Sequence, residues 1–205
     1  LLILSLPMAY WLVFGKFKGR GIIEAMIGMP LVLPPSVIGF YLLLAFSPGN
    51  GFGAWVEAVF GLRLVFSFPG LVIASLIYSF PFMVYPLRAG LQSLPASLRE
   101  ASYSLGKSEW GTFFKILLPN CKSAILTAFV LTFAHTIGEF GVVLMIGGNI
   151  PGVTKVASVA IYNEVEALNY RAANQYAFIL FAITFAILLI VYSVNNRLLR
   201  ARNHS

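Results

Sequence analysis

Long stretches of the chain carry no charged residue, and this feature restricts the available folds more than any other. Residues 64–87 form an uncharged run of 24 residues between Arg63 and Arg88, and residues 172–196 form one of 25. A helix needs about 20 apolar residues to cross the hydrocarbon core of a bilayer. Charged residues make up only 10% of the 205 positions, against about 25% in soluble domains. The sequence therefore predicts an all-α integral membrane protein.

Three further apolar segments are expected to lie in the membrane. Residues 25–46 and 123–146 are long enough to span it, and residues 1–14 are shorter. We interpret residues 1–14 as a span whose beginning is missing, because they lack the basic start and the small-residue cleavage site of a signal peptide. The prediction is about five transmembrane helices.

Basic residues are distributed unevenly among the loops between these segments. Only Arg63, Lys155 and Arg171 lie on one side of the predicted membrane topology. The other eleven lie on the opposite side: Lys16, Lys18, Arg20, Arg88, Arg99, Lys107, Lys115, Lys122, Arg197, Arg200 and Arg202. Because cytoplasmic loops are enriched in Lys and Arg, this predicts an outside N-terminus and a cytoplasmic C-terminus. We do not interpret the net charge of +7 as nucleic-acid binding, because the cations are spread over three loops without a nucleic-acid motif.

The chain is poor in residues that form catalytic or metal sites. It has one cysteine, Cys121, two histidines and seven acidic residues, all of them glutamates. His204, in the polar tail, is interpreted as incidental. Residues 105–108 (Leu-Gly-Lys-Ser) resemble the end of a phosphate-binding loop, but Ala101 stands where that loop needs its first glycine and no buried strand precedes it. The sequence thus predicts no catalytic residue, no metal site and no nucleotide site in this chain.

A short helix is predicted within the loop 88–122. Pro95 suits the first turn of a helix, and Gly106 suits its end. Four residues between them recur at helical spacing and predict one packed face: Leu98, Ala101, Ser102 and Leu105. Arg99 and Tyr103 are placed on the other face. Isolated helices need about 12 to 15 residues, so this one should be ordered by its own spans and by a partner. The alternative is an amphipathic linker that lies on the membrane.

The spacing in this loop resembles the EAA loop of ABC importer permeases. The residues that carry the resemblance are Glu100, Ala101, Ser102, Gly106, Ile116 and Pro119, with Ser102 where the family usually has alanine. The resemblance implies that the loop docks on a cytoplasmic ATPase. ATP would then be bound and hydrolysed by that separate subunit, so this chain would be no enzyme and would hold no cofactor. A bulky side chain at Gly106 is expected to obstruct the turn that ends the coupling helix.

Prolines and two ionisable residues mark unusual parts of the spans. Pro30, Pro34 and Pro35 in residues 25–46, and further prolines in residues 64–87, predict kinks. Backbone carbonyls freed in a membrane are tolerated only where protein or a watery cavity satisfies them. These segments therefore either line a transport pathway or are static kinks that serve packing.

His135 and Glu139 lie one helical turn apart in residues 123–146, on one face. Ionisable residues within a span usually face a bundle interior, a partner or water, and are functional by default. A structural role also stays open for each of the two residues. Glu139 is then a structural residue that hydrogen-bonds neighbouring helices, and His135 is a neutral interior histidine.

Three segments resemble the signature of the molybdate permease branch of ABC importers: residues 133–141, 145–152 and 158–162. This branch is related to sulfate and thiosulfate permeases, and the similarity covers residues 19–196. The assignment to the molybdate branch and not to the sulfate branch rests on residues 148–152 (Gly-Asn-Ile-Pro-Gly) and on the lack of further helices. The resemblance gives candidate pathway or gate residues, namely Pro34, Pro35, His135, Glu139, Phe140 and Gly141. It also gives candidate outer docking residues, namely Gly148, Asn149, Pro151 and Gly152.

What the resemblance implies is a type I permease subunit, one transmembrane domain over residues 1–205, in the inner or cytoplasmic membrane. The expected partners are a second permease copy, two cytoplasmic ABC ATPase subunits, membrane lipid and an extracytoplasmic molybdate-binding protein that docks on residues 47–63 and 147–171. A sulfate, thiosulfate or tungstate permease is the nearest alternative. A secondary transporter or channel would need inverted repeats, which we do not find. An intramembrane enzyme would need more than His135 and Glu139.

Overall fold

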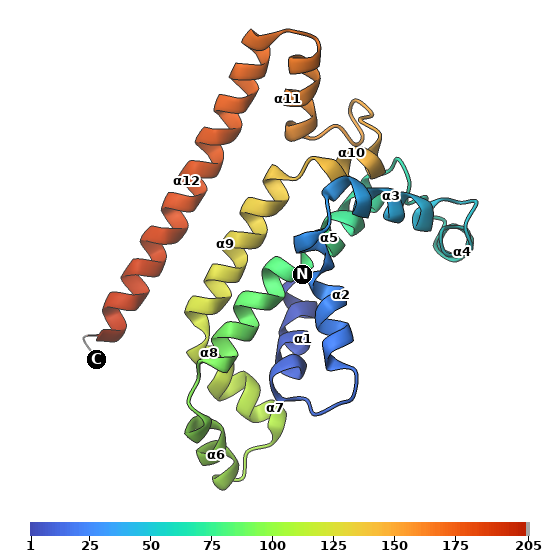
Figure 1. Ribbon diagram of the computed structural model, residues 1–205. Coiled ribbons are helices and arrows are strands. Elements are labelled where there is room, and N and C mark those ends of the chain that lie inside the picture. Colours follow the sequence, from blue (N-terminus) through green and yellow to red (C-terminus); the bar gives the residue numbers. More distant parts are fainter. Residues whose placement is uncertain (204–205) are drawn as a thin grey trace. The chain divides into compact units, whose positions relative to one another are not determined.

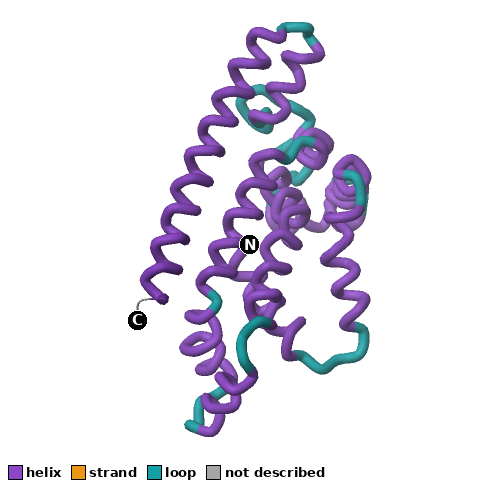
Figure 2. The backbone as a smooth tube through the Cα atoms, turned by 60° about the vertical axis from the view of Figure 1, so that its left-hand side comes forward, coloured by secondary structure: helices purple, strands orange, loops and turns teal. Residues whose placement is uncertain are grey.

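The computed structural model describes the backbone of residues 1–203 and the side chains of residues 1–193 (Figures 1 and 2). Every element in the described part is helical, which confirms the all-α prediction. In chain order the helices are α1 (Leu2–Phe14), α2 (Arg20–Val32), α3 (Pro35–Phe46), α4 (Gly51–Phe60), α5 (Phe68–Gln92), α6 (Ala96–Ser104), α7 (Glu109–Thr112), the π-helical turn η1 (Phe113–Leu117), α8 (Leu118–Asn120), α9 (Lys122–Gly138), α10 (Gly141–Gly147), α11 (Ala157–Glu166) and α12 (Tyr170–Asn203). The predicted cytoplasmic residues Arg197, Arg200 and Arg202 and the tail residue His204 lie outside the described side chains.

Among the residues that the structure describes, two single helices are long and apolar enough to cross a membrane. They are α5, with 25 residues, and Tyr170–Ser193 of α12, with 24 residues. They overlap the uncharged runs 64–87 and 172–196 of the sequence. The number rises to four if each of two sharply bent helix pairs counts as one span. The helix α1 has 13 residues and is shorter than a span.

The predicted span over residues 25–46 is broken rather than kinked. The helices α2 and α3 meet at an angle of 116°. Pro34 is the N-cap of α3, and Pro35 is its first residue, where the missing N–H costs nothing. A residue before proline avoids the helical region, so Pro34 and Pro35 together end α2 and start a new helix. In contrast, α5 continues through Pro81 and Pro86.

The predicted span over residues 123–146 is also divided. The helix α9 ends at Gly138 and α10 begins at Gly141, so Glu139 and Phe140 form the break. On the other side of α9, the segment Glu109–Asn120 is bent by 74° from Lys122–Gly138. The ionisable residues of this region thus lie at a helix end and not in the middle of a regular span.

The chain divides into two compact units, described here one at a time. One unit contains Leu1–Ile27, Phe80–Phe133 and Ile190–Ser205. Its largest core joins buried side chains of α1, the end of α5, η1 and α9: Ala9, Met83, Leu87, Leu91, Phe113, Leu117, Cys121 and Ala128. Gly90 of α5 faces Ala124 of α9 so closely that a Cβ on Gly90 would collide with the Ala124 methyl group. This contact brings the start of α9 against the end of α5.

The other unit contains Gly28–Ser79 and Ala134–Leu189. Within it α10 packs on α3 (Figure 1). A Cβ on Gly39 would lie 2.9 Å from the Met145 Cβ, and one on Gly141 would lie 2.6 Å from the Pro35 Cβ. These two glycines therefore set the close approach of the helices. The core beside them consists of Phe46, Val56, Leu64, Ala74, Tyr78, Val142 and Ile146.

Candidate functional site

The short helix α6 carries the first three residues of the EAA-like motif and ends as the sequence predicts. Gly106 has a φ of +72°. Its N–H donates to the Tyr103 carbonyl at 2.9 Å, and the Lys107 N–H donates to the Ser102 carbonyl at 3.2 Å. These two bonds form a Schellman motif, which needs a left-handed residue at the position of Gly106. Pro95, expected in the first turn, is instead the N-cap.

The buried face of α6 differs from the predicted stripe. Ser102 is buried and Leu98 is half-buried, as expected, but Ala101 is exposed and Leu105 is 79% exposed. Arg99, predicted on the outer face, places its guanidinium carbon 4.6 Å from the centre of the Phe14 ring. This cation–π contact turns α6 toward α1 on the Leu98–Ser102 side. Glu100, Ala101 and Leu105 are left exposed.

A buried pair of hydroxyl groups joins α6 to α7. The Ser102 Oγ lies 2.8 Å from the Thr112 Oγ1. The turn between the two helices is closed by Ser108, the N-cap of α7, whose side chain accepts a bond from the Gly111 N–H at 3.2 Å. Our sequence reasoning missed Thr112 and Ser108. A Ser followed directly by Glu109 is a recognisable helix start, whereas Thr112 has no local signal.

The second half of the motif lies in η1 and α8. Ile116 is half-buried, and its carbonyl accepts a bond from the Asn120 Nδ2 at 2.7 Å; Pro119 is exposed. Aromatic side chains cluster beside them: Tyr10, Trp110, Phe113 and Phe114. Phe113 is fully buried, whereas Trp110 is 62% exposed. The loop therefore presents a partly apolar surface that includes Leu105 and Trp110.

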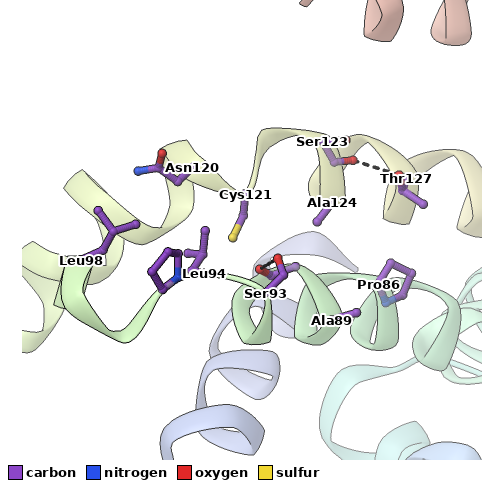
Figure 3. Close-up of a pocket in the computed structure, with 12 residues that line it drawn as sticks. Pro86, Ala89, Ser93, Leu94, Leu98, Asn120, Cys121, Ser123, Ala124 and Thr127 are labelled. Carbon is purple, nitrogen blue, oxygen red and sulfur yellow. Dashed lines mark hydrogen bonds between the residues drawn. The ribbon is translucent and has the colours of Figure 1, made fainter. Parts of the chain in front are cut away.

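A pocket of about 670 Å³ opens at the base of this loop (Figure 3). It is lined by the end of α5, the residues that precede α6, and the start of α9. Cys121 points into it, yet its side chain is only 3% exposed. Nearby polar groups are satisfied locally, since the Ser93 Oγ donates to the Gly90 carbonyl and the Thr127 Oγ1 to the Ser123 carbonyl. A thiol this buried is a poor target for a labelling reagent.

An ion-pair network joins α2 to α5 in the same unit. The Glu24 Oε1 lies 2.8 Å from the Arg20 Nε and 3.2 Å from an Arg88 terminal nitrogen. The Tyr85 hydroxyl donates to the Glu24 carbonyl at 3.2 Å. The Arg88 side chain is only 20% exposed, and its buried Nε has no hydrogen-bond partner within the described side chains. One carboxylate thus balances two guanidinium groups.

In the other unit, Glu139 organises the break between α9 and α10. Its Oε1 accepts a bond from the Val142 N–H at 2.7 Å, and its carbonyl accepts one from the Ser158 Oγ at 2.6 Å. Glu139 is buried, and its Oε2 lies 4.0 Å from the His135 Nε2. The carboxylate therefore caps the first turn of α10, which supports the structural reading of this residue.

Five of the six candidate gate residues line one pocket of about 620 Å³. They are Pro35, His135, Glu139, Phe140 and Gly141, joined by Ser36 and Tyr78. The ring of His135 lies 4.9 Å from that of Tyr78, centre to centre. Pro34 is not among the lining residues; it caps α3. Within the described residues, no three His, Cys or Glu side chains come close enough to hold a metal ion.

The candidate docking residues form a tight loop after α10. Gly148, Asn149 and Gly152 all have left-handed φ values, of 65°, 57° and 73°. Pro151 lies between them and is exposed. The loop is closed by Thr154, whose Oγ1 donates to the Gly147 carbonyl at 2.6 Å and accepts from the Ile150 N–H at 3.0 Å. Thr154 was not predicted from the sequence, where nothing distinguishes it from other threonines.

The following helix α11 carries both polar and apolar side chains on its exposed side. The Tyr162 hydroxyl donates to the Glu166 carboxylate, and this hydrogen bond raises the pKa of Tyr162 above its usual value. Asn169 donates to Glu164 at 2.8 Å. The segment between α10 and α12 thus presents glycines, amides and charges together with exposed apolar side chains, among them Val153 and Leu168, which are 51% and 72% exposed.

Comparison with known proteins identifies the family of this chain. Residues 2–204 match the family described as "Binding-protein-dependent transport system inner membrane component". The chain is 41% identical over 193 residues to the molybdenum transport system permease protein ModB of Azotobacter vinelandii, covering 94% of this chain and 85% of that protein. It is 36% identical over 176 residues to the probable sulfate transport system permease protein cysT of Chlorella vulgaris, covering 86% and 66%.

A bacterial sulfate relative is similar over the same length. The identity to the sulfate transport system permease protein CysT of Escherichia coli is 33% over 193 residues, covering 94% of this chain and 68% of the relative. The chain thus spans about two thirds of the sulfate relatives. Since the family match runs through almost every described residue, this chain belongs to the inner-membrane components of binding-protein-dependent transport systems, the permeases of ABC importers.

Proposed function

We propose that the chain is the permease subunit of an ATP-driven importer of molybdate. The observation that carries the proposal is the 41% identity to a molybdenum permease over 94% of the chain. Molybdate and sulfate are both tetrahedral oxyanions, so the two groups of relatives imply one class of substrate. We expect the pathway to bind this anion only weakly, so that the anion can be released. Selectivity would then reside in an extracytoplasmic binding protein, and tungstate would be accepted beside molybdate.

The coupling role is assigned to the loop between α5 and α9. Exposed Ala101 on α6, together with exposed Leu105 and Trp110 after it, gives a small-residue and apolar surface for an ATPase subunit, and the exposed Glu100 carboxylate lies on the same helix. Two such ATPases, a second permease copy and the binding protein would complete the transporter. ATP would be bound by the ATPases, with the N-terminus of this chain outside and its C-terminus in the cytoplasm.

The gate is proposed at the α3–α10 contact. The pocket that includes Pro35, His135 and Glu139 lies beside the Gly141–Pro35 contact, so a small shift of α10 would change its width. Glu139 would hold α10 in place. His135 is proposed to line the pathway.

The test is uptake by the complete transporter, reconstituted in vesicles with its ATPase and its binding protein. Labelled molybdate should be transported only when ATP is present on the side of the vesicle membrane that carries the ATPase. Tungstate should compete with molybdate for uptake. A sulfate permease is the second candidate, favoured by the 33% identity to CysT over 193 residues. Sulfate uptake without molybdate uptake would assign the chain to that branch. Uptake without ATP would instead indicate a secondary transporter or channel.

A further inference from the structure

The helix α4, Gly51–Phe60, exposes a face made only of apolar side chains. Its exposed large side chains are Phe52, Trp55, Val59 and Phe60, between 52% and 60% exposed. Ala54 and Ala58 are exposed between them. An apolar surface of this kind in contact with water is unfavourable and marks a site of interaction. Within the described side chains, nothing covers it.

The one charged side chain of α4 lies at the edge of this face and is held in an ion pair. Glu57 is the one charged residue of α4. Its Oε1 accepts a hydrogen bond from the Arg63 Nε at 2.8 Å, and the Arg63 side chain is 74% exposed. The helix thus has a wide apolar and partly aromatic surface, and its one carboxylate is held in an ion pair at the edge of that surface.

The opposite face of α4 is attached to the end of α3. Gly53 lies against the carbonyl groups of Phe46 and Ser47, where a Cβ would collide with both oxygens. The Asn50 Nδ2 donates to the Leu44 carbonyl at 2.5 Å. Val56 is buried in one cluster with Phe46 and Leu64. The position of α4 is therefore set by the ends of its neighbouring helices.

These neighbours place α4 at the level where a span begins. The membrane-length helix α5 starts at Phe68, and only residues 61–67 connect it to the end of α4. At 1.5 Å per residue, the ten residues of α4 extend about 15 Å, half of the hydrocarbon core, so α4 does not span it. Trp and other aromatic side chains concentrate at the membrane–water interface.

We propose that α4 lies in the extracytoplasmic interface of the membrane, with Phe52, Trp55, Val59 and Phe60 among phospholipid headgroups and upper acyl chains. The side of the membrane rests on the proposed topology, whereas the contact with lipid does not. This changes the role expected for residues 47–63. The surface for a soluble binding protein is then the segment between α10 and α12, which presents charges and amides beside its apolar side chains, whereas the exposed face of α4 has no polar side chain.

The test uses spin labels in the complete transporter, reconstituted in vesicles of phosphatidylethanolamine and phosphatidylglycerol. Cys121 is the only cysteine of the chain, so Cys121→Ser gives a cysteine-free permease that is labelled before assembly. The label is placed at Val59→Cys, and the matched control is Lys155→Cys, an exposed residue of the segment between α10 and α12. Oxygen dissolves in the bilayer, whereas a nickel chelate stays in water. At position 59 collisions with oxygen should dominate, and at position 155 collisions with the nickel chelate.

Three results would overturn the proposal. Equal nickel accessibility at positions 59 and 155 would place α4 in water. A label at position 59 that neither reagent reaches would mean that protein, such as a second copy, covers the face. Loss of oxygen accessibility on adding the binding protein would restore the docking role. Each labelled permease must assemble with its ATPase subunits, and Phe60→Cys repeats the measurement if Val59→Cys does not assemble.

Discussion

The hydroxyl groups of Ser102 and Thr112 lie 2.8 Å apart, and both side chains are almost fully buried, with exposures of 4% and 1%. This bond joins α6 to α7 across the turn that contains Gly106. The residue that departs from the alanine usual in EAA-like loops therefore has a structural partner ten residues further along the chain. The two positions should tolerate change only together.

We expect Ser102→Ala to destabilise the coupling loop, because it leaves the buried Thr112 hydroxyl without its partner. Such a loss costs about 1 to 3 kcal/mol. The double variant Ser102→Ala, Thr112→Val removes both hydroxyls and should recover most of that loss. The measurement is hydrogen exchange of the α6 amides together with the affinity for the ATPase. If the effects of Ser102→Ala and Thr112→Val alone added up to the effect of the double variant, the two hydroxyls would not interact.

At Gly106 the backbone, and not the size of the side chain, should decide the effect of substitution. No atom outside the neighbouring residues lies within 4 Å of the position that a Cβ would occupy, so the cost of a side chain within this chain arises from the φ of +72°. A left-handed conformation costs most L-residues about 1 to 2 kcal/mol, and Asn tolerates it best. Gly106→Asn should therefore retain binding-protein-stimulated ATP hydrolysis, and Gly106→Val should lose it. Equal behaviour of the two variants would contradict this assignment.

For Glu139 we expect the hydrogen bond to matter more than the charge. Glu139→Gln retains an oxygen that can accept from the Val142 N–H, whereas Glu139→Ala removes the cap of α10, worth about 0.5 to 2 kcal/mol. Anion uptake should survive the first change and fall with the second, and the amides at the start of α10 should exchange faster in the second. If Glu139→Gln abolished uptake while α10 stayed protected, Glu139 would act through its charge.

The sequence was informative where a single local property determines the structure. The uncharged runs 64–87 and 172–196 overlap α5 and α12, and both helices are long and apolar enough to cross a membrane. The end of α6 at Gly106 was predictable because a left-handed residue closes a Schellman motif. The membership of an importer permease family, suggested by the EAA-like spacing, is confirmed.

The sequence was insufficient where tertiary contacts decide. Pro34 and Pro35 predict lost hydrogen bonds but not an angle of 116°, which depends on how α3 packs on α10 at Gly39. The break at Glu139 has no proline and arises because the side chain caps a new helix. The inner face of α6 was assigned wrongly at Ala101 and Leu105, because Phe14, far away in sequence, attracts Arg99.

We expect Glu24 to hold α2 against α5 through Arg88. Glu24→Gln leaves two guanidinium groups without a carboxylate, and one of them is largely buried. The apparent melting temperature of the detergent-solubilised permease should fall. Arg20→Gln is the matched control, since it removes the more exposed cation and leaves the Glu24–Arg88 pair intact, so its effect should be smaller. A larger effect of Arg20→Gln would place the main ion pair within α2.

Topology should follow the distribution of basic residues. Cys121 is too buried to report it, so the test needs introduced cysteines in the Cys121→Ser background. Lys107 and Lys155 are matched exposed lysines, one in the loop assigned to the cytoplasm and one in the outer segment. In intact cells a membrane-impermeant maleimide should label Lys155→Cys at once, and Lys107→Cys only after the membrane is permeabilised. Because an ATPase can reach α6 only from the cytoplasm, the reverse labelling pattern would remove the coupling role proposed for Glu100, Ala101 and Gly106.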